Sequence, residues 1–191
     1  MRPAVFLDRD GTVIEERGYL DRLDLIELFP WSAEAIRLLN GAGYAVVIVT
    51  NQAGIARGFF DEAFVRSAHA HLDGLLRARG AVVDGYYYCP HHPDGRVDSY
   101  RATCACRKPA AGMVYQAAAD LDLDVTRSFV VGDKWLDIGL ANTAGATGVL
   151  VRTGCAGGEE PAPPTGAEPA AVMDTLLDAA RWIIARGPAP R

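Results

Sequence analysis

Short apolar runs and amphipathic stretches alternate along this chain of 191 residues. The apolar runs predict five strands buried on both faces, at 4–8, 44–49, 81–88, 128–131 and 146–151. Between the strands, apolar positions recur at helical spacing, which predicts helices at 32–40, 61–80, from Pro109 onward, after Asp133 and at 171–186. Strands that alternate with helices are typical of an α/β fold, here a five-stranded parallel sheet between two layers of helices.

Residues typical of helix ends support this division. Ser32 and Asp61 are expected N-caps, because their side chains can accept a hydrogen bond from the first helical turn. Pro109 fits the first position of a helix, where a missing N–H is harmless. Gly80 ends the second long helix.

Three segments lack apolar periodicity and are expected to be loops. Residues 11–29 mix glycine, tyrosine and charged residues, which predicts an irregular flap or a short hairpin. Residues 89–106 are rich in proline, histidine, cysteine and glycine. Residues 156–170 are rich in glycine, proline and glutamate and predict a mobile connection. No repeat appears, and we expect residues 1–191 to form a single domain.

Composition narrows the classes of protein to consider. Half of the residues are apolar, which suits one globular domain with a sizeable core. The net charge of −5 argues against a nucleic-acid-binding protein, and no apolar run is long enough to cross a bilayer. Because the N-terminus lacks a charged and apolar leader, we expect a cytoplasmic protein. We also expect a monomer.

Two carboxylates, Asp8 and Asp10, follow directly on the first predicted strand. Residues i and i+2 of an extended or turning chain point the same way, so both can face one site past the carboxyl end of the strand. Open α/β sheets bind their ligands there, and Gly11 lets the chain turn away with unusual backbone angles. The alternative interpretation is an Asp-rich turn after an ordinary edge strand.

Polar residues also stand near the ends of other predicted elements. They are Thr50-Asn51, Arg107-Lys108 and Gly132-Asp133-Lys134-x-x-Asp137. A parallel sheet would bring these strand ends to the Asp8 loop. Each group has a plain alternative: Thr50-Asn51 as a strand-end turn, Lys108 as a solvated surface charge, and Gly132-Asp133 as a helix N-cap.

These residue types suit the hydrolysis of a phosphate monoester. Asp8 can attack phosphorus and form an aspartyl-phosphate, which divides one slow reaction into two faster steps. Asp8, Asp133 and the backbone carbonyl of Asp10 can bind Mg²⁺, which prefers oxygen ligands. Lys108 and the Thr50 hydroxyl can stabilise the charged phosphoryl group. Asp10 is placed to protonate the leaving alcohol and then to deprotonate water.

The four motifs, in this order and spacing, resemble the haloacid dehalogenase (HAD) superfamily of phosphohydrolases over roughly residues 4–151. The resemblance implies a three-layer Rossmann-like fold, with Asp8 as the nucleophile and Asp10 as the acid and base. The role of Asp137 stays open between orienting Lys134 and orienting a water molecule bound to the metal.

Three cysteines and a histidine stand at the ends of the 89–106 loop, namely Cys89, His91, Cys104 and Cys106. Three thiolates and one imidazole are a closed set of structural zinc ligands. A zinc ion would hold this loop and aim the two cations that follow it. Free thiols or a redox pair are alternatives, and His92 is an alternative ligand. We expect Cys155 to be an ordinary thiol and His69 and His71 to be structural.

Longer stretches, together with Arg9, narrow the resemblance. They are Thr50-Asn51-Gln52-Ala53-Gly54-Ile55-Ala56-Arg57-Gly58, Cys89-Pro90-His91-His92-Pro93 and Cys104-x-Cys106-Arg107-Lys108-Pro109. These stretches are similar to the D-glycero-D-manno-heptose 1,7-bisphosphate 7-phosphatases and to their relatives, the histidinol-phosphate phosphatases. The first resemblance implies a Mg²⁺-dependent enzyme, which removes the 7-phosphate in the synthesis of nucleotide-activated heptose for lipopolysaccharide. The second implies histidinol phosphate as the alternative substrate. We expect no cap domain, because core elements and the cysteine loop occupy the segments before Thr50 and between Thr50 and Lys108.

The resemblance also implies substrate contacts at Glu16, Arg17, Gly18, Tyr19, Thr50, Asn51, Gln52 and Ala53. From their charge, we expect Arg107, Lys108 and Lys134 to contact the substrate as well. Cations on the predicted active-site loops are Arg9, Arg17, Arg57, Arg107 and Lys134. We expect Arg107 to bind the remote phosphate of a sugar bisphosphate through paired hydrogen bonds. The alternatives are that these cations only balance nearby carboxylates, or that the domain is a non-catalytic binding module stabilised by metal.

Overall fold

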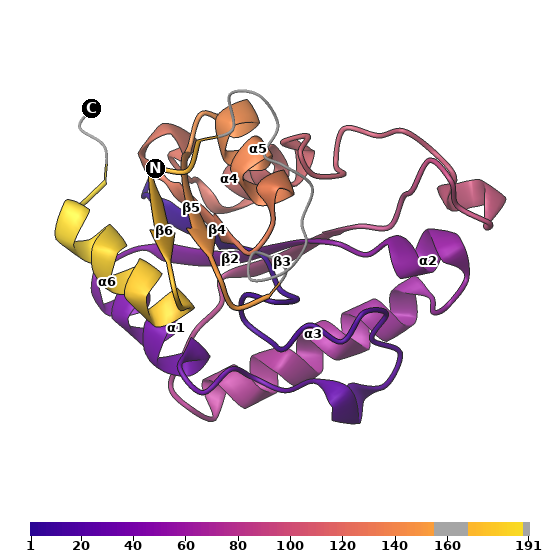
Figure 1. Cartoon of the computed structure of the whole chain (residues 1–191), viewed down its shortest axis with the longest axis horizontal. Helices are drawn as coiled ribbons and strands as arrows, with labels where there is room; N and C mark the ends of the chain where they lie inside the picture. Colours follow the sequence, from indigo (N-terminus) through magenta and orange to yellow (C-terminus); the bar gives the residue numbers. More distant parts are fainter. Residues whose placement is uncertain (155–167, 189–191) are drawn as a thin grey trace.

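A computed structural model of the chain describes residues 1–154 and 168–188 (Figure 1). Cys155 and most of the predicted connection at 156–170 lie outside the described residues. The described part is a three-layer α/β/α arrangement, as the alternation of strands and helices predicts, and no separate cap domain occurs in it. None of its helices is both long and apolar enough to span a membrane.

The central sheet has six parallel strands in the order β3-β2-β1-β4-β5-β6. Their bounds are Ala4–Leu7 (β1), Ala45–Asn51 (β2), Gly85–Cys89 (β3), Phe129–Gly132 (β4), Thr147–Val151 (β5) and Ala171–Met173 (β6). The prediction of five strands is therefore wrong by one edge strand. β6 is only three residues long, and too short a run to show the alternation that marks a strand.

The helices cover both faces of the sheet (Figure 1). Their bounds are Ser32–Gly41 (α1), Ala53–Arg57 (α2), Glu62–Arg77 (α3), Gly112–Leu121 (α4), Trp135–Ala144 (α5) and Leu176–Arg186 (α6). Side chains of α1, α3 and α6 pack with Val5 and Leu7 of β1, whereas those of α4 and α5 pack with Ala4 and Phe6. Successive residues of β1 thus point to opposite layers, which explains why its whole run is apolar.

Several element ends differ from the sequence prediction. Ser32 is the first residue of α1 rather than its cap, and its hydroxyl donates to the Val13 carbonyl at 2.7 Å. Pro109 does not open α4; it lies in a turn closed by the hydrogen bond from Ala110 N–H to the Arg107 carbonyl, and the helix begins at Gly112. The predicted helix at 171–186 begins only at Leu176, after β6. Asp61 caps α3 as predicted and accepts a hydrogen bond from Phe64 N–H.

The register of the sheet brings three polar residues to one edge. Leu7 is level with Ile48 of β2 on one side and with Val131 of β4 on the other. Asp8, Thr50 and Asp133 therefore all lie within two residues of the same level. From β1 the chain adds β2 and β3 on one side of the sheet and β4, β5 and β6 on the other. Open α/β sheets bind their ligands at such a point, where the direction of strand addition switches.

The predicted flap is a distorted hairpin next to this edge. Ile14 pairs antiparallel with Leu28, and Glu15 N–H donates to the Glu27 carbonyl at 2.9 Å. A short 3₁₀ turn at Leu23–Leu25 lies within it. The hairpin reaches over the carboxyl ends of the strands and forms one wall of the site described next.

Candidate active site

Three buried carboxylates meet past the ends of β1 and β4. Asp8 follows β1, Asp133 follows β4, and Asp137 lies in the first turn of α5. Each offers an oxygen atom, and these atoms lie within 4.8 Å of one another. Asp8 is fixed by its backbone N–H, which donates to the Val131 carbonyl at 2.9 Å. The predicted closeness of positions 8 and 133 is confirmed, although they are far apart in sequence.

Lys108 lies among these carboxylates. Its Nζ atom is 2.8 Å from Asp8 Oδ1 and 2.6 Å from Asp137 Oδ1, and its side chain is buried. Burial alone would lower the pKa of Lys108, but the charges of Asp137 and Asp8 outweigh it and raise the pKa. Asn51 clamps the lysine backbone, because its Oδ1 accepts Lys108 N–H at 3.0 Å while its Nδ2 donates to the Lys108 carbonyl. Lys108 is therefore a fixed cation rather than a solvated surface charge.

Asp137 is the acidic partner of this lysine. One of its oxygens binds Lys108 Nζ, and the other accepts Lys134 N–H at 3.2 Å. Burial raises the pKa of Asp137 to about 6, even though the Lys108 charge opposes this shift. Both oxygens of Asp137 thus already have protein donors, and the side chain ties together the cationic segments around Lys108 and Lys134.

Glycines allow the backbone to approach Asp133 closely. Gly11 has a φ of +84°, and a Cβ atom there would lie 2.5 Å from Asp133 Oδ2. Gly154, which follows β5, would also overlap that carboxylate if it carried a side chain. Thr12 Oγ1 donates to Asp133 Oδ1 at 3.4 Å. A side chain at either glycine position would therefore clash with this carboxylate, so both positions require glycine.

Asp10 lies apart from the three buried carboxylates. Its side chain accepts hydrogen bonds from Arg9 and from Gln52 Nε2, the latter at 3.1 Å. Gln52 Nε2 also donates to Thr50 Oγ1 at 2.9 Å. Asp10 lines both of the cavities described next, so its carboxylate faces the same space as Asp8 from another side.

Two adjoining cavities of about 200 and 190 Å³ open above these residues. Both are lined by Asp10, Asn51, Ala53 and Lys134. The first also contains Glu16, Gly18, Tyr19 and Gln52, and the second contains Asp8, Thr50, Arg107, Lys108 and Asp137. Of the positions expected to contact substrate, only Arg17 lines neither cavity. Its guanidinium bonds to Glu15 and Glu27 and thereby braces the hairpin.

The flap is held against the rest of the site by polar and aromatic contacts. Lys134 Nζ lies 2.9 Å from Glu16 Oε2. Burial would lower the pKa of Lys134, but Asp8, Asp133 and Glu16 raise it overall. The Tyr19 ring lies 4.5 Å from the Phe59 ring, and the Arg57 guanidinium lies over it at 5.6 Å. The flap therefore encloses one side of the first cavity.

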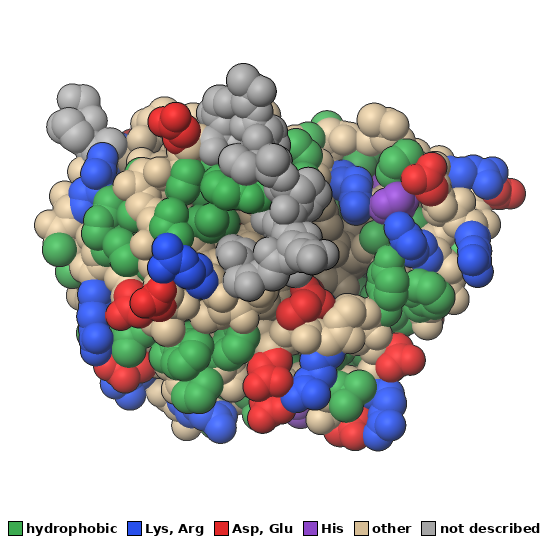
Figure 2. Space-filling model, viewed as in Figure 1, with side chains coloured by type: hydrophobic (Ala, Val, Ile, Leu, Met, Phe, Trp, Pro, Cys, Tyr) green, Lys and Arg blue, Asp and Glu red, His purple; other side chains and the backbone are tan. Residues whose placement is uncertain are grey.

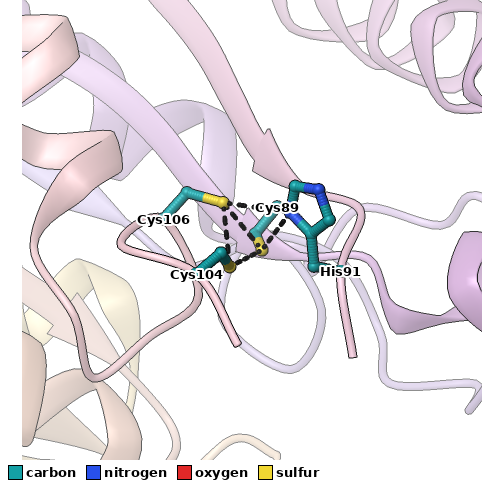
Figure 3. A group of neighbouring side chains, drawn as sticks. All are labelled: Cys89, His91, Cys104 and Cys106. Atoms are coloured by element: carbon teal, nitrogen blue, oxygen red, sulfur yellow. Dashed lines mark hydrogen bonds between the residues drawn. The ribbon is translucent and has the colours of Figure 1, made fainter. Parts of the chain in front are cut away.

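The cysteine and histidine side chains of the 89–106 loop converge (Figure 3). Cys106 Sγ lies 3.0 Å from Cys89 Sγ and 3.3 Å from Cys104 Sγ. His91 Nδ1 lies 3.4 Å from Cys106 Sγ. All three cysteines are free thiols, and four soft or borderline donors in a group this small are compatible with a tetrahedral zinc site.

Other histidines lie elsewhere. His92 is not part of this group; its Nδ1 accepts Asp94 N–H, and its Nε2 lies 3.4 Å from Arg57. His69 is buried in α3 and stacks on Tyr86. Burial, together with the charge of Arg9, lowers the pKa of His69 to about 3, so the ring is neutral. The geometry agrees with the expectation that His69 is structural.

Comparisons with known proteins place this arrangement among phosphatases. A family model described as polynucleotide kinase 3 phosphatase matches residues 4–136, and a HAD-hydrolase-like model matches residues 105–179. The chain is 48% identical over 153 residues to a D-glycero-beta-D-manno-heptose-1,7-bisphosphate 7-phosphatase of Photorhabdus laumondii, covering 80% of this chain and 81% of that protein. It is 45% identical over 177 residues to the protein of the same name from Yersinia pestis, covering 92% and 90%.

Solved structures agree with these sequence relatives. The crystal structure of a D,D-heptose 1,7-bisphosphate phosphatase from B. bronchiseptica, complexed with magnesium and phosphate, matches with a TM-score of 0.79. The two chains are 34% identical, and the match covers 98% of this chain and 100% of that one.

Sequence reasoning missed two features of the site. Arg9 was expected on an active-site loop, yet its side chain is buried and bonds to Asp10. Asp137 was not assigned to Lys108, which is its ion-pair partner. The sequence does not show that Arg9 and Lys108 are buried, because burial depends on how distant segments of the chain pack in the folded protein.

Proposed function

Because the chain belongs to the HAD-like family of D-glycero-beta-D-manno-heptose-1,7-bisphosphate 7-phosphatases, we propose that it hydrolyses the 7-phosphate of that sugar bisphosphate. The observation that carries the proposal is the group formed by Asp8, Lys108 and Asp133 beside a cavity at the switch point of the sheet. The relatives' names specify the β anomer, which we take as the preferred substrate.

Asp8 is the nucleophile in this proposal. Its Oδ1 accepts Arg9 N–H at 2.8 Å and lies 2.8 Å from Lys108 Nζ, which fixes the carboxylate. Attack on phosphorus forms an aspartyl-phosphate, and the alcohol of the sugar leaves. The Lys108 charge and the Thr50 hydroxyl stabilise the charge on the phosphoryl oxygens in the transition state.

Asp10 acts as the acid and base. Its carboxylic acid gives a proton to the leaving oxygen as the phosphorus–oxygen bond breaks. The resulting carboxylate then takes a proton from the water that attacks the aspartyl-phosphate. Asp10 lines the same cavity as Asp8, which places both carboxylates beside the space open to the substrate.

The acidic residues present fit a bound Mg²⁺ ion. Asp8 and Asp133 would hold it together with the backbone carbonyl of Asp10, since Mg²⁺ prefers a few oxygen ligands and retains waters. Asp137 is less suited, because both of its oxygens already accept protein donors. When bound, the ion would neutralise negative charge and orient the phosphoryl group.

We also propose that Cys89, His91, Cys104 and Cys106 hold a structural zinc ion. This site would fix the loop that leads into Arg107, whose guanidinium donates to the His91 carbonyl at 3.2 Å. Arg107 lines the second cavity beside Lys108. A guanidinium in that place suits the remote phosphate of the substrate, and Lys134 and Tyr19 line the space for the sugar.

Two other substrates must be compared with the heptose bisphosphate. The match to a polynucleotide kinase 3 phosphatase model makes a 3′-phosphorylated oligonucleotide one candidate, and histidinol phosphate is the other. On the face shown in Figure 2, acidic and basic side chains are mixed, which does not favour the binding of a nucleic-acid strand.

Phosphate release should be measured for the β and α anomers of heptose 1,7-bisphosphate, heptose 7-phosphate and both rival substrates, with added Mg²⁺. We expect the highest kcat/KM for the β-bisphosphate. A higher kcat/KM for histidinol phosphate or for the oligonucleotide would overturn the proposal. Arg107→Ala should reduce the preference for bisphosphate over monophosphate, and an unchanged preference would remove Arg107 from the remote-phosphate site.

A further inference from the structure

Arg9 lies between Asp8 and Asp10 in the sequence, and its side chain is buried, which is unusual for a cation. Its side chain is only about 4% exposed and lines neither cavity, so it cannot serve as a contact for the substrate. Its guanidinium instead forms a fork on Asp10. Nε donates to Oδ2 at 3.1 Å, and one terminal nitrogen donates to Oδ1 at 3.0 Å.

Gln52 completes the set of donors around Asp10. Its amide nitrogen donates both to Asp10 Oδ2 at 3.1 Å and to Thr50 Oγ1 at 2.9 Å. Both amide hydrogens are therefore used within the protein. Among the described residues, Oδ2 accepts from Arg9 and Gln52, whereas Oδ1 accepts from Arg9 alone. Oδ1 is thus the oxygen with a lone pair left for proton exchange.

A carboxylate without such donors would rotate, because the last side-chain torsion of aspartate is broad. Proton transfer to the leaving oxygen needs a heavy-atom distance of about 2.6–3.2 Å, so rotation would reduce the fraction of productive geometries. The planar fork of an arginine fixes both the position and the plane of a carboxylate, which a lysine does not. The ring of the buried His69 is neutral and leaves Asp10 as the counter-charge of Arg9.

We propose that Arg9, assisted by Gln52, is a positioning residue that holds the Asp10 carboxyl group with Oδ1 toward the leaving oxygen. This inference rests on the proposed role of Asp10. In the first step Asp10 loses its proton to the ester oxygen while Asp8 forms its bond to phosphorus. In the second step Asp10 regains a proton from the attacking water, and inorganic phosphate leaves Asp8.

The test compares two leaving groups. An alkyl phosphate, such as heptose 7-phosphate, needs a proton on its leaving oxygen, whereas p-nitrophenyl phosphate releases a stable anion that does not. The parameter kcat/KM reports the first irreversible step, which is the attack on phosphorus. In Arg9→Met, we expect kcat/KM to fall about 10²-fold for the alkyl phosphate, the lower end of general-acid effects, and about threefold or less for p-nitrophenyl phosphate.

Four variants separate the explanations. Arg9→Lys keeps the charge but not the fork, and we expect an intermediate loss with the same dependence on leaving group. Gln52→Leu should act in the same direction more weakly, and it carries the test if Arg9→Met does not fold. Arg22→Met removes an exposed arginine paired with Asp24 and serves as the control. It should leave kcat/KM unchanged for both substrates. Asp10→Asn removes the acid itself, so its loss of kcat/KM for the alkyl phosphate relative to p-nitrophenyl phosphate should be the largest of all the variants.

Equal losses for the two substrates in Arg9→Met would mean general structural damage and would overturn the inference, as would no loss at all. The role of Asp10 can fail separately. If Asp10→Asn shows no dependence on leaving group, the proposed acid–base role is wrong. If Asp10→Asn shows it and the Arg9 variants do not, only the positioning role is wrong. Any alkyl phosphate that the wild-type protein hydrolyses can serve, so the test does not depend on the sugar.

Discussion

Replacing Lys108 by Met should strongly destabilise the protein, because its ammonium group neutralises a buried acidic cluster. Nζ lies 2.8 Å from Asp8 and 2.6 Å from Asp137, and Asp133 belongs to the same group. Removing one partner of a buried ion pair costs about 3–5 kcal/mol. In a chain of this size each kcal/mol lowers Tm by about 2–4 °C, so we expect Tm to fall by about 10 °C.

The loss should depend on pH in a defined direction. Burial raises the pKa of Asp137 to about 6 in the folded protein even with Lys108 present, above its usual value of 3.8. Without Lys108 the pKa should rise further, because the opposing charge is gone. A group that binds its proton more tightly when folded makes the protein less stable as pH rises. The deficit of Lys108→Met should therefore be larger at about pH 8 than at about pH 5.

Thermal unfolding followed by circular dichroism measures both effects, with and without added MgCl₂. Mg²⁺ should raise the Tm of Lys108→Met more than that of the wild-type protein, because the uncompensated cluster attracts a cation more strongly. Arg77→Met is a matched control: it removes an exposed ion pair with Asp73, which is worth at most about 1 kcal/mol. If Lys108→Met unfolds at the temperature of this control at both pH values, Lys108 does not neutralise the cluster.

The remaining predictions concern one residue each. Asp8→Asn should abolish turnover while the fold stays intact, since Lys108 keeps Asp137 as its partner and an amide cannot attack phosphorus effectively; phosphoenzyme formed by this variant would refute the role of Asp8. Cys104→Ser should lower the bound zinc per chain, Tm and, indirectly, activity; unchanged zinc stoichiometry with full stability would exclude the proposed site. Because the pKa of His69 is lowered to about 3, stability should decrease as pH falls from about 6.5 to 3, by up to about 5 kcal/mol. His69→Phe should remove this decrease, and parallel curves of unfolding free energy against pH for the two proteins would contradict it.

The parts of the fold that the sequence predicts are those with long, regular patterns. The apolar run before Asp8 predicts a buried strand, and the alternation of such runs with helices predicts the parallel sheet. β6 and α2 are three and five residues long, too short for a period to show. Pro109 fits a helix start by its own chemistry, but it lies in a turn that ends at Ala110, and the first residue of the helix, Gly112, packs against the Ala105 backbone. That contact depends on the folded cysteine loop and is not encoded locally.

The positions of the site residues could be predicted from the sequence, but their ion-pair partners could not. Asp8, Thr50 and Asp133 come together because parallel strands end at one edge, which follows from the strand pattern alone. Lys108 was expected to face substrate, and it is found bonded to Asp8 and Asp137 as well. Pairing depends on side-chain directions that only the packed structure determines.

The balance of charge explains why a divalent cation suits this site. Five carboxylates and three cations line or underlie the two cavities in the described part of the chain. Arg107, at the second cavity, is counted separately. The carboxylates are Asp8, Asp10, Glu16, Asp133 and Asp137, and the cations are Arg9, Lys108 and Lys134. With all five carboxylates ionised the sum is −2, or −1 with Arg107, and the proton that Asp10 donates in the first step brings it to zero. These residues therefore offer a phosphate dianion no net positive charge in a partly buried space, where charges are weakly screened. A bound divalent cation would supply that positive charge beside Asp8, so the balance of charge supports the proposed Mg²⁺ dependence independently of the relatives.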